Sequence, residues 1–99
     1  MIRHIVMWKL SATDPAERVS VTQEITRLLE GLLGVVPGMT SLKVTSDLGN
    51  YSTNFDLVLV SEHDSPEALQ GYQDHPAHQA AAQWIRANVS HRACVDSAH

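Results

Sequence analysis

The chain has 99 residues, a formal net charge of -4 and seven Lys and Arg residues, which are scattered without a cluster. A chain of this length is expected to form one domain, residues 1–99, with a small core, and partner subunits often supply the missing buried surface at this size. The charge pattern speaks against nucleic acid and anionic membrane surfaces as partners. The small size of the core predicts an oligomer.

The sequence shows neither a targeting segment nor a membrane segment. Its first ten residues lack the apolar core and cleavage site of a signal peptide, and no apolar run approaches the roughly eighteen residues that span a bilayer. Cys94 is the only cysteine, which excludes an internal disulfide and predicts no thiolate metal site within the chain. These features predict a cytoplasmic protein.

Residues 2–10 alternate with a period of two, which predicts a β-strand. One face of this strand would consist of Ile2, His4, Val6, Trp8 and Leu10. The opposite face also carries apolar side chains, at Ile5 and Met7. Because both faces are apolar, both need cover, and we expect helices on one face and a second subunit on the other.

The next segment predicts an amphipathic helix. Asp14 is a suitable N-cap, Pro15 suits the first helical position, and Glu17 can complete a capping box. Apolar residues then recur every three or four positions, at Val21, Ile25, Leu28, Leu29, Leu32 and Leu33. This spacing predicts about five turns. Gly34 can end the helix in a left-handed conformation, before a turn at Pro37 and Gly38.

Two more strands and a short helix follow. Residues 40–46 and 55–60 alternate in polarity, and the Asp-Leu-Gly-Asn sequence at 47–50 is typical of a turn between them. Ser65 and Pro66 repeat the combination of a cap and a first-position proline, which predicts a helix start.

Pro76 interrupts the second helical segment. Proline has no backbone N–H and its ring clashes with the preceding turn, so it suits the first position of a new helix. Asp74 or His75 would then be the cap and His78 a first-turn residue. Tyr72, near the end of the preceding helix, could meet His78 across the break. A phenol beside an imidazole is a potential acid and base pair.

The second part of this helix should run to about residue 88, and a last strand should follow over 89–96. The order is strand, helix, strand, strand, helix, strand. This order predicts an α+β fold, a ferredoxin-like βαββαβ subunit whose four-stranded antiparallel sheet has the helices on one face.

Several segments together resemble a known family. They are the opening Met-Ile-Arg-His-Ile-Val-Met-Trp-Lys-Leu, the turn at 36–39, the helix at 67–72, the His-Pro-Ala-His string at 75–78, and the closing Cys-Val-Asp at 94–96. The chain is similar over essentially its whole length to the stress-responsive dimeric α/β-barrel (Dabb) domain proteins. The resemblance implies a homodimer in which two sheets lie face to face as a barrel.

One plant branch of that family, the olivetolic acid cyclases, closes a linear polyketide thioester by an intramolecular aldol condensation. The resemblance implies that Tyr72 and His78 carry such chemistry here, because both match that branch in identity and spacing. His78 would be the base and Tyr72 the hydrogen-bond donor to the enolate oxygen. His4 would be an orienting residue of the pocket.

The remaining lining of this pocket is expected to be apolar. The residues that we predict to contact a ligand, besides His4, are Val6, Trp8, Leu57, Leu59 and Trp84. The two tryptophans could equally be plain core, which is the commoner role of buried aromatic residues. The aromatic cluster on the first helix of the plant enzymes is absent, since Val21 and Ile25 stand in that region.

The sequence is compatible with functions of different classes. One is the binding of a small, largely apolar molecule, with cofactor-free acid/base chemistry of the polyketide-cyclase type. Another is a non-catalytic stress or stability protein whose functional unit is the dimer, with His78 and Tyr72 as packing residues. A cofactor-free monooxygenase is a third, for which no distinctive residue is present. None of the three requires a cofactor.

The other histidines and the cysteine are assigned structural or surface roles. His75 lies three residues before His78, a spacing that can bind a metal, but no third or fourth ligand is arranged nearby. We therefore predict no metal site and interpret His75 as a cap. His63, His91 and His99 are expected at the surface, and Cys94 is expected to be a small hydrophobic residue without an activating neighbour.

Overall fold

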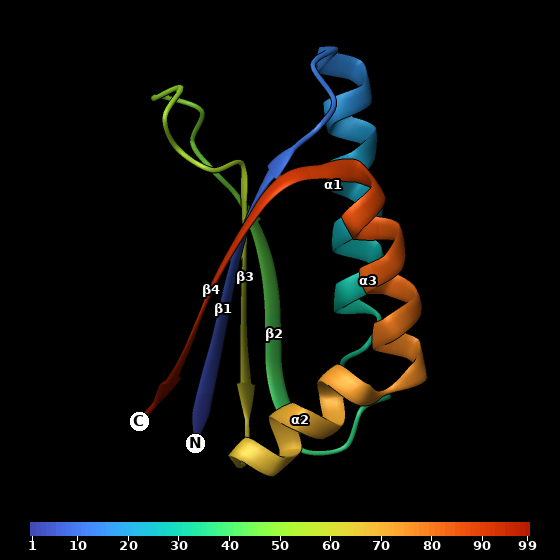
Figure 1. The fold of residues 1–99 in the computed structure, drawn as a ribbon, viewed down its shortest axis with the longest axis vertical. Helices are drawn as coiled ribbons and strands as arrows, with labels where there is room; N and C mark the ends of the chain where they lie inside the picture. Colours follow the sequence, from blue (N-terminus) through green and yellow to red (C-terminus); the bar gives the residue numbers. More distant parts are fainter.

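Four antiparallel strands form one sheet, and three helices cover one of its faces (Figure 1). The computed structural model describes residues 1–99. Its elements are β1 (Ile2–Leu10), α1 (Pro15–Glu30), β2 (Met39–Ser46), β3 (Leu57–His63), α2 (Pro66–Asp74), α3 (Pro76–Asn88) and β4 (Val89–Ala98). The strand order is β2-β3-β1-β4, and all neighbouring pairs are antiparallel. The predicted ferredoxin-like fold is confirmed.

The chain ends lie side by side at one end of the sheet (Figure 1), where the His99 N–H donates to the Met1 carbonyl at 3.0 Å. α1 and α3 pack against each other over the sheet, and α2 lies across its end. None of the three helices has the length and apolar character that crossing a bilayer would require.

Helix α1 begins as predicted but ends earlier. The Asp14 carboxylate accepts a hydrogen bond from the Glu17 N–H at 3.0 Å, and Pro15 is the first helical residue. The helix ends at Glu30 instead of continuing to residue 33. Beyond it the chain tightens, because the Leu32 N–H bonds to the Leu29 carbonyl three residues back at 3.0 Å.

Strand β3 differs from the prediction at both ends. It spans Leu57–His63, whereas the alternation of apolar residues indicated 55–60. The extension is possible because strand pairing uses backbone groups, so a polar stretch pairs as well as an apolar one: Ile2 of β1 lies opposite His63. β4 likewise continues to Ala98, two residues beyond the expected end.

The strand register determines which side chains point toward the helices. On β1, His4, Val6 and Trp8 are buried, as the alternation predicted. Their partners on β4 are Asp96, Cys94 and Arg92 in that order, and side chains of directly opposite residues share a face of the sheet. The side chains of His4, Val6 and Trp8 and those of the three β4 residues therefore border the same space between the sheet and the helices.

The opposite face of the sheet has no helix over it (Figure 1). Its centre is apolar and brings together Ile5, Met7, Val58, Val60 and Val95, which are directly paired across β3, β1 and β4. Met7 is 39% exposed and Val95 is 62% exposed. A contiguous apolar surface of this kind is typical of a protein interface.

The turn before β2 places α2 close to the sheet. Gly38 has a φ of +79°, and a Cβ added there would lie 2.7 Å from the Ala68 Cβ of α2. The Gly38 carbonyl accepts from the Asp64 N–H at 2.9 Å. Glycine is needed at this position both for the left-handed backbone and for the close approach of the helix. Gly49, with a φ of +80°, has no neighbour within 4 Å of its added Cβ.

These two glycines give a matched test of the packing of α2. We expect Gly38→Ala to lower the free energy of unfolding by roughly 2–4 kcal/mol, through backbone strain together with overpacking against Ala68. Gly49→Ala should cost only the strain, about 1–2 kcal/mol. Urea unfolding of both variants measures the difference, and equal losses would contradict the close contact.

Candidate functional site

A cavity of about 300 Å³ lies between the sheet and the helices. It is lined by residues from β1, β3, β4 and all three helices: His4, Val6, Trp8, Leu29, Leu59, Tyr72, His78, Ala82, Ile85, Arg86 and Arg92. Apolar side chains make up most of this lining, and the ionisable groups come from a few positions. This combination is common in small-molecule sites.

Most of the residues that the sequence singled out for ligand contact line this cavity. They are His4, Val6, Trp8, Leu59, Tyr72 and His78. Leu57 does not line it: its side chain is buried on the helix-covered face opposite Trp8, and the residue also borders an open hollow of about 630 Å³ formed with the β2–β3 loop. Trp84 faces a groove between α1 and α3, because it follows His78 by six positions and so points roughly 120° away around the helix.

The break in the helical segment forms as predicted. α2 ends at Asp74, His75 is extended with a ψ of 134°, and Pro76 starts α3. The His75 Nδ1 accepts from the Ala77 N–H at 3.1 Å, so His75 is the cap of α3. Its ring nitrogen is thus engaged at the helix start.

Tyr72 and His78 meet across this break. Their ring centroids are 4.4 Å apart. Tyr72 is fully buried, and its hydroxyl has no hydrogen-bond partner among the protein atoms. Burial raises the pKa of Tyr72 to about 12, so the phenol is neutral at physiological pH. A buried hydroxyl without a partner is uncommon, and here it belongs to a residue that lines the cavity.

A hydrogen bond to the backbone fixes the tautomer of His78. Its Nδ1 lies 3.1 Å from the Gln73 carbonyl oxygen. A carbonyl only accepts hydrogen bonds, so Nδ1 carries the hydrogen and Nε2 keeps a free lone pair. Burial lowers the pKa of His78; the bond to Gln73 opposes this, and the charges of His4, Arg92 and Arg86 lower it further. The imidazole is therefore neutral near pH 7.

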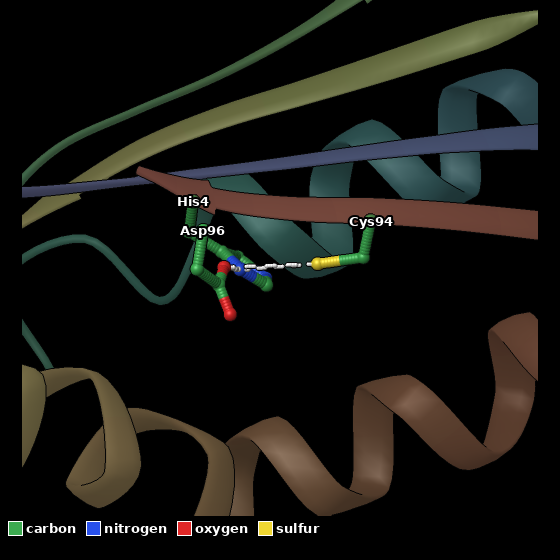
Figure 2. A group of neighbouring side chains, drawn as sticks. All are labelled: His4, Cys94 and Asp96. Carbon is green, nitrogen blue, oxygen red and sulfur yellow. Dashed lines mark hydrogen bonds and ion pairs between the residues drawn. The ribbon is translucent and has the colours of Figure 1, made fainter. Parts of the chain in front are cut away.

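His4 is held by an acidic partner at the edge strand (Figure 2). Its Nδ1 donates to Oδ1 of Asp96 at 2.5 Å, and the Cys94 sulfur lies 3.7 Å from each of these atoms. The three side chains lie on the side of the sheet that faces the helices. The His4 ring centroid is 6.1 Å from that of Tyr72. Asp96 therefore orients a buried histidine beside the phenol.

His4, Cys94 and Asp96 are also the only residues whose donor atoms, all within 4.8 Å of one another, could hold a metal ion. Two tetrahedral ligands of zinc lie roughly 3.3 Å apart, however, which is longer than the His4–Asp96 distance of 2.5 Å. Burial and the charge of Asp96 raise the pKa of the Cys94 thiol, which disfavours the thiolate that a metal needs. The arrangement fits a hydrogen-bonded pair better than a metal site. Cys94 is exposed and not packed as a small hydrophobic residue.

His63 was predicted at the surface, and this prediction is wrong. Its side chain is fully buried at the end of β3, with Nε2 2.9 Å from the Ser61 hydroxyl. Its ring centroid lies 5.0 Å from that of Tyr72. Burial lowers the pKa of His63, and the charge of His4 lowers it further. Continuing the period-two alternation from Leu59 would have placed His63 on the buried face.

Two arginines at the cavity were missed in the sequence. Arg86 follows His78 by eight positions and so lies on the same side of α3, and Arg92 is opposite Trp8 on β4. Neither takes part in any of the ion pairs of the structure. The helical spacing from His78 was a usable signal for Arg86, whereas the position of Arg92 depends on the strand register.

The whole-chain pattern matches one protein family, the Stress responsive A/B Barrel Domain, over residues 2–99. The chain belongs to this family. No curated protein sequence matches it.

Solved structures share the fold of this A/B barrel domain. A dimeric ferredoxin-like protein of unknown function from Bacteroides fragilis is 26% identical, with a TM-score of 0.88 over 99% of this chain and 95% of that chain. A dimeric ferredoxin-like protein of unknown function from Thermobifida fusca is 27% identical, with a TM-score of 0.79 over 99% and 90%. A hydroxynitrile lyase from Passiflora edulis is 17% identical, with a TM-score of 0.74 over 97% and 90%, and shares the fold.

The buried histidines make the stability of this A/B barrel domain depend on pH. The pKa values of His63 and His78 are lowered in the folded state, whereas the unfolded value is about 6.5. Their contribution is complete above that value and is lost as the pH falls below it, because the unfolded chain then binds more protons. We expect the midpoint temperature of thermal unfolding to decrease when the pH is lowered from 7.5 to 5.

His63→Leu should reduce this dependence, since one of the two shifted groups is removed. Thermal unfolding of the wild type and the variant at both pH values measures the effect. An equal loss in the two proteins would contradict the assignment to His63.

Proposed function

We propose that this A/B barrel protein binds a small, largely apolar carbonyl compound in the cavity and catalyses a proton transfer on it, as in an aldol cyclisation of the polyketide-cyclase type. The observation that carries the proposal is the unpartnered hydroxyl of Tyr72, a residue that lines the same cavity as a neutral His78. A carbonyl oxygen of a ligand would give this hydroxyl the acceptor that the protein does not supply.

The proposed reaction uses the two side chains in different roles. The free Nε2 of His78 removes a proton from a carbon between two carbonyl groups. The electron pair of the broken C–H bond is delocalised onto a carbonyl oxygen, which gives an enolate. The Tyr72 phenol donates a hydrogen bond to the enolate oxygen, where the negative charge gathers. The enolate carbon then attacks a second carbonyl of the same molecule, and the new alkoxide takes back the proton from His78. His4, held by Asp96, orients the ligand.

The geometry supports this division of roles. A phenol with a pKa of about 12 keeps its proton and can donate a hydrogen bond, whereas an imidazole with a lowered pKa is unprotonated and can accept a proton. The hydroxynitrile lyase from Passiflora edulis shares the fold, and a shared fold does not fix the substrate.

The proposed roles predict the effects of two substitutions. With linear 3,5,7-trioxoalkanoic acids and their thioesters as substrates, His78→Ala should reduce the rate by about 10²–10⁴-fold, since the general base is lost. Tyr72→Phe should reduce it by about 10²–10³-fold, since a donor to the developing negative charge is lost. The wild-type rate should fall only at a pH below the ordinary imidazole pKa of about 6.5, because burial lowers the pKa of His78 and this base is protonated at a correspondingly lower pH. Product formation is followed by liquid chromatography.

His91→Ala is a suitable control, because His91 is exposed on β4 and lies outside the cavity. Circular dichroism of each variant separates a lost role from lost folding. Wild-type turnover in both cavity variants would show that the roles are wrongly assigned. If the wild type turned over none of these acids and thioesters, the non-catalytic alternative, a stress or stability protein whose functional unit is the dimer, would be favoured.

We also propose that the protein is a homodimer in which the helix-free faces of two sheets meet. The apolar centre of this face, formed by Ile5, Met7, Val58, Val60 and Val95, supports the proposal, as do the dimeric relatives. The residues that flank this centre on the same face include an ion pair, Arg3 with Glu62 at 3.0 Å, and polar neutral residues such as Thr45. Such a polar border around an apolar centre is usual in protein interfaces.

Substitution at the centre of this face tests the dimer. Met7→Asp should produce a monomer at micromolar concentration, because a carboxylate would be buried without a partner. Val19→Asp on α1, which is 58% exposed in the wild type, should leave the dimer intact. Light scattering coupled to size exclusion measures the mass. A wild-type monomer, or a dimer in the Met7 variant, would contradict this interface.

A further inference from the structure

The cavity has a cationic side that the proposed proton transfer does not use. Arg86 of α3 and Arg92 of β4 line it, and both side chains are exposed to solvent. β4 is an edge strand of the sheet, and both arginine side chains are exposed. The two arginines therefore border the cavity where it meets the solvent. Arg86 lies two helical turns beyond His78, about 12 Å along the axis. The arginines are therefore placed at the mouth and the acid/base pair deeper inside.

The positive charge at this mouth is not neutralised by the protein. Neither Arg86 nor Arg92 forms an ion pair, and Asp96, the acid nearest in the strand, bonds to His4 at 2.5 Å. The chain as a whole has a net charge of -4. Two guanidinium groups without an ion-pair partner thus make this side of the cavity locally positive in a chain of net negative charge. Their field reaches the interior, because both lower the pKa of His78.

Guanidinium groups bind particular anions well. Their planar array of N–H donors matches a carboxylate or a phosphate, and their charge persists at every physiological pH. The remaining contacts in the cavity are mostly apolar, through residues such as Val6, Leu29 and Ile85. A ligand that satisfies both regions has an apolar body and an anionic end.

We infer that Arg86 and Arg92 form an anion subsite at the mouth of the cavity, and that the ligand is recognised as a free carboxylic acid with its carboxylate at these arginines. This inference rests on the proposed function, since it assigns the ligand class of the same cavity. The carbonyl group that reacts then points inward, toward Tyr72 and His78.

Matched ligands test the subsite without requiring turnover. 4-Butylbenzoate carries the carboxylate, 4-butylbenzamide is its neutral counterpart, and 4-butylphenyl phosphate carries the other anion that arginines bind. Isothermal titration calorimetry at an ionic strength of about 0.15 M limits diffuse attraction between distant charges. We expect the wild type to bind the benzoate about tenfold or more tightly than the benzamide, as is usual for charged hydrogen bonds.

Variants assign this preference to the two arginines. The double variant R86Q/R92Q should lose the tenfold preference for the benzoate while its affinity for the benzamide stays within about twofold. R86K/R92K should retain part of the preference, since the charge is kept and the planar geometry is lost. Arg27→Gln is the control, because Arg27 is exposed on α1, pairs with Glu24 and lies outside the cavity.

The outcomes separate the subsite from the proposed function. Equal binding of benzoate and benzamide, or a preference that persists in R86Q/R92Q, would overturn the subsite and leave the cavity as a ligand site. Binding of the phosphate more than tenfold tighter than the benzoate would overturn the carboxylate assignment. If neither the benzoate nor the benzamide bound to the wild type, both the subsite and the proposed ligand site would be refuted.

Discussion

The candidate site depends on a single backbone constraint, the inability of Pro76 to continue a helix. Without an N–H and with a ring that clashes with the preceding turn, it forces the chain to stop at Asp74 and to begin again. His75 makes the restart stable by accepting the Ala77 N–H. The two short helices consequently meet at an angle, and the rings of Tyr72 and His78 face each other at 4.4 Å.

Burial then gives the two rings different chemistry. The same dry surroundings raise the pKa of the phenol and lower that of the imidazole, so both groups are neutral at physiological pH. One is left as a donor and the other as an acceptor. The charges of Arg86 and Arg92 reinforce the neutral state of His78. The carboxylate of Asp96 holds the His4 ring beside that of Tyr72.

The prediction from sequence succeeded where the signal was local. The start of α1 at Asp14 and Pro15, the restart at Pro76 and the buried face of β1 depend on residues within a few positions of one another. It failed where strands continue through polar residues. β3 was ended too early because its last three residues are polar, and for that reason His63 was wrongly assigned to the surface.

The amino-acid sequence by itself determined the order of the elements, the helix break and the pairing of a phenol with an imidazole, since proline geometry, capping and periodicity act over short distances. Only the tertiary structure decided that Asp96 meets His4, that Arg92 reaches the cavity and that Trp84 turns away from it. His4 and Asp96 are brought together by the pairing of β1 with β4, strands from opposite ends of the chain. Such register depends on the packing of the whole sheet, which no short segment encodes.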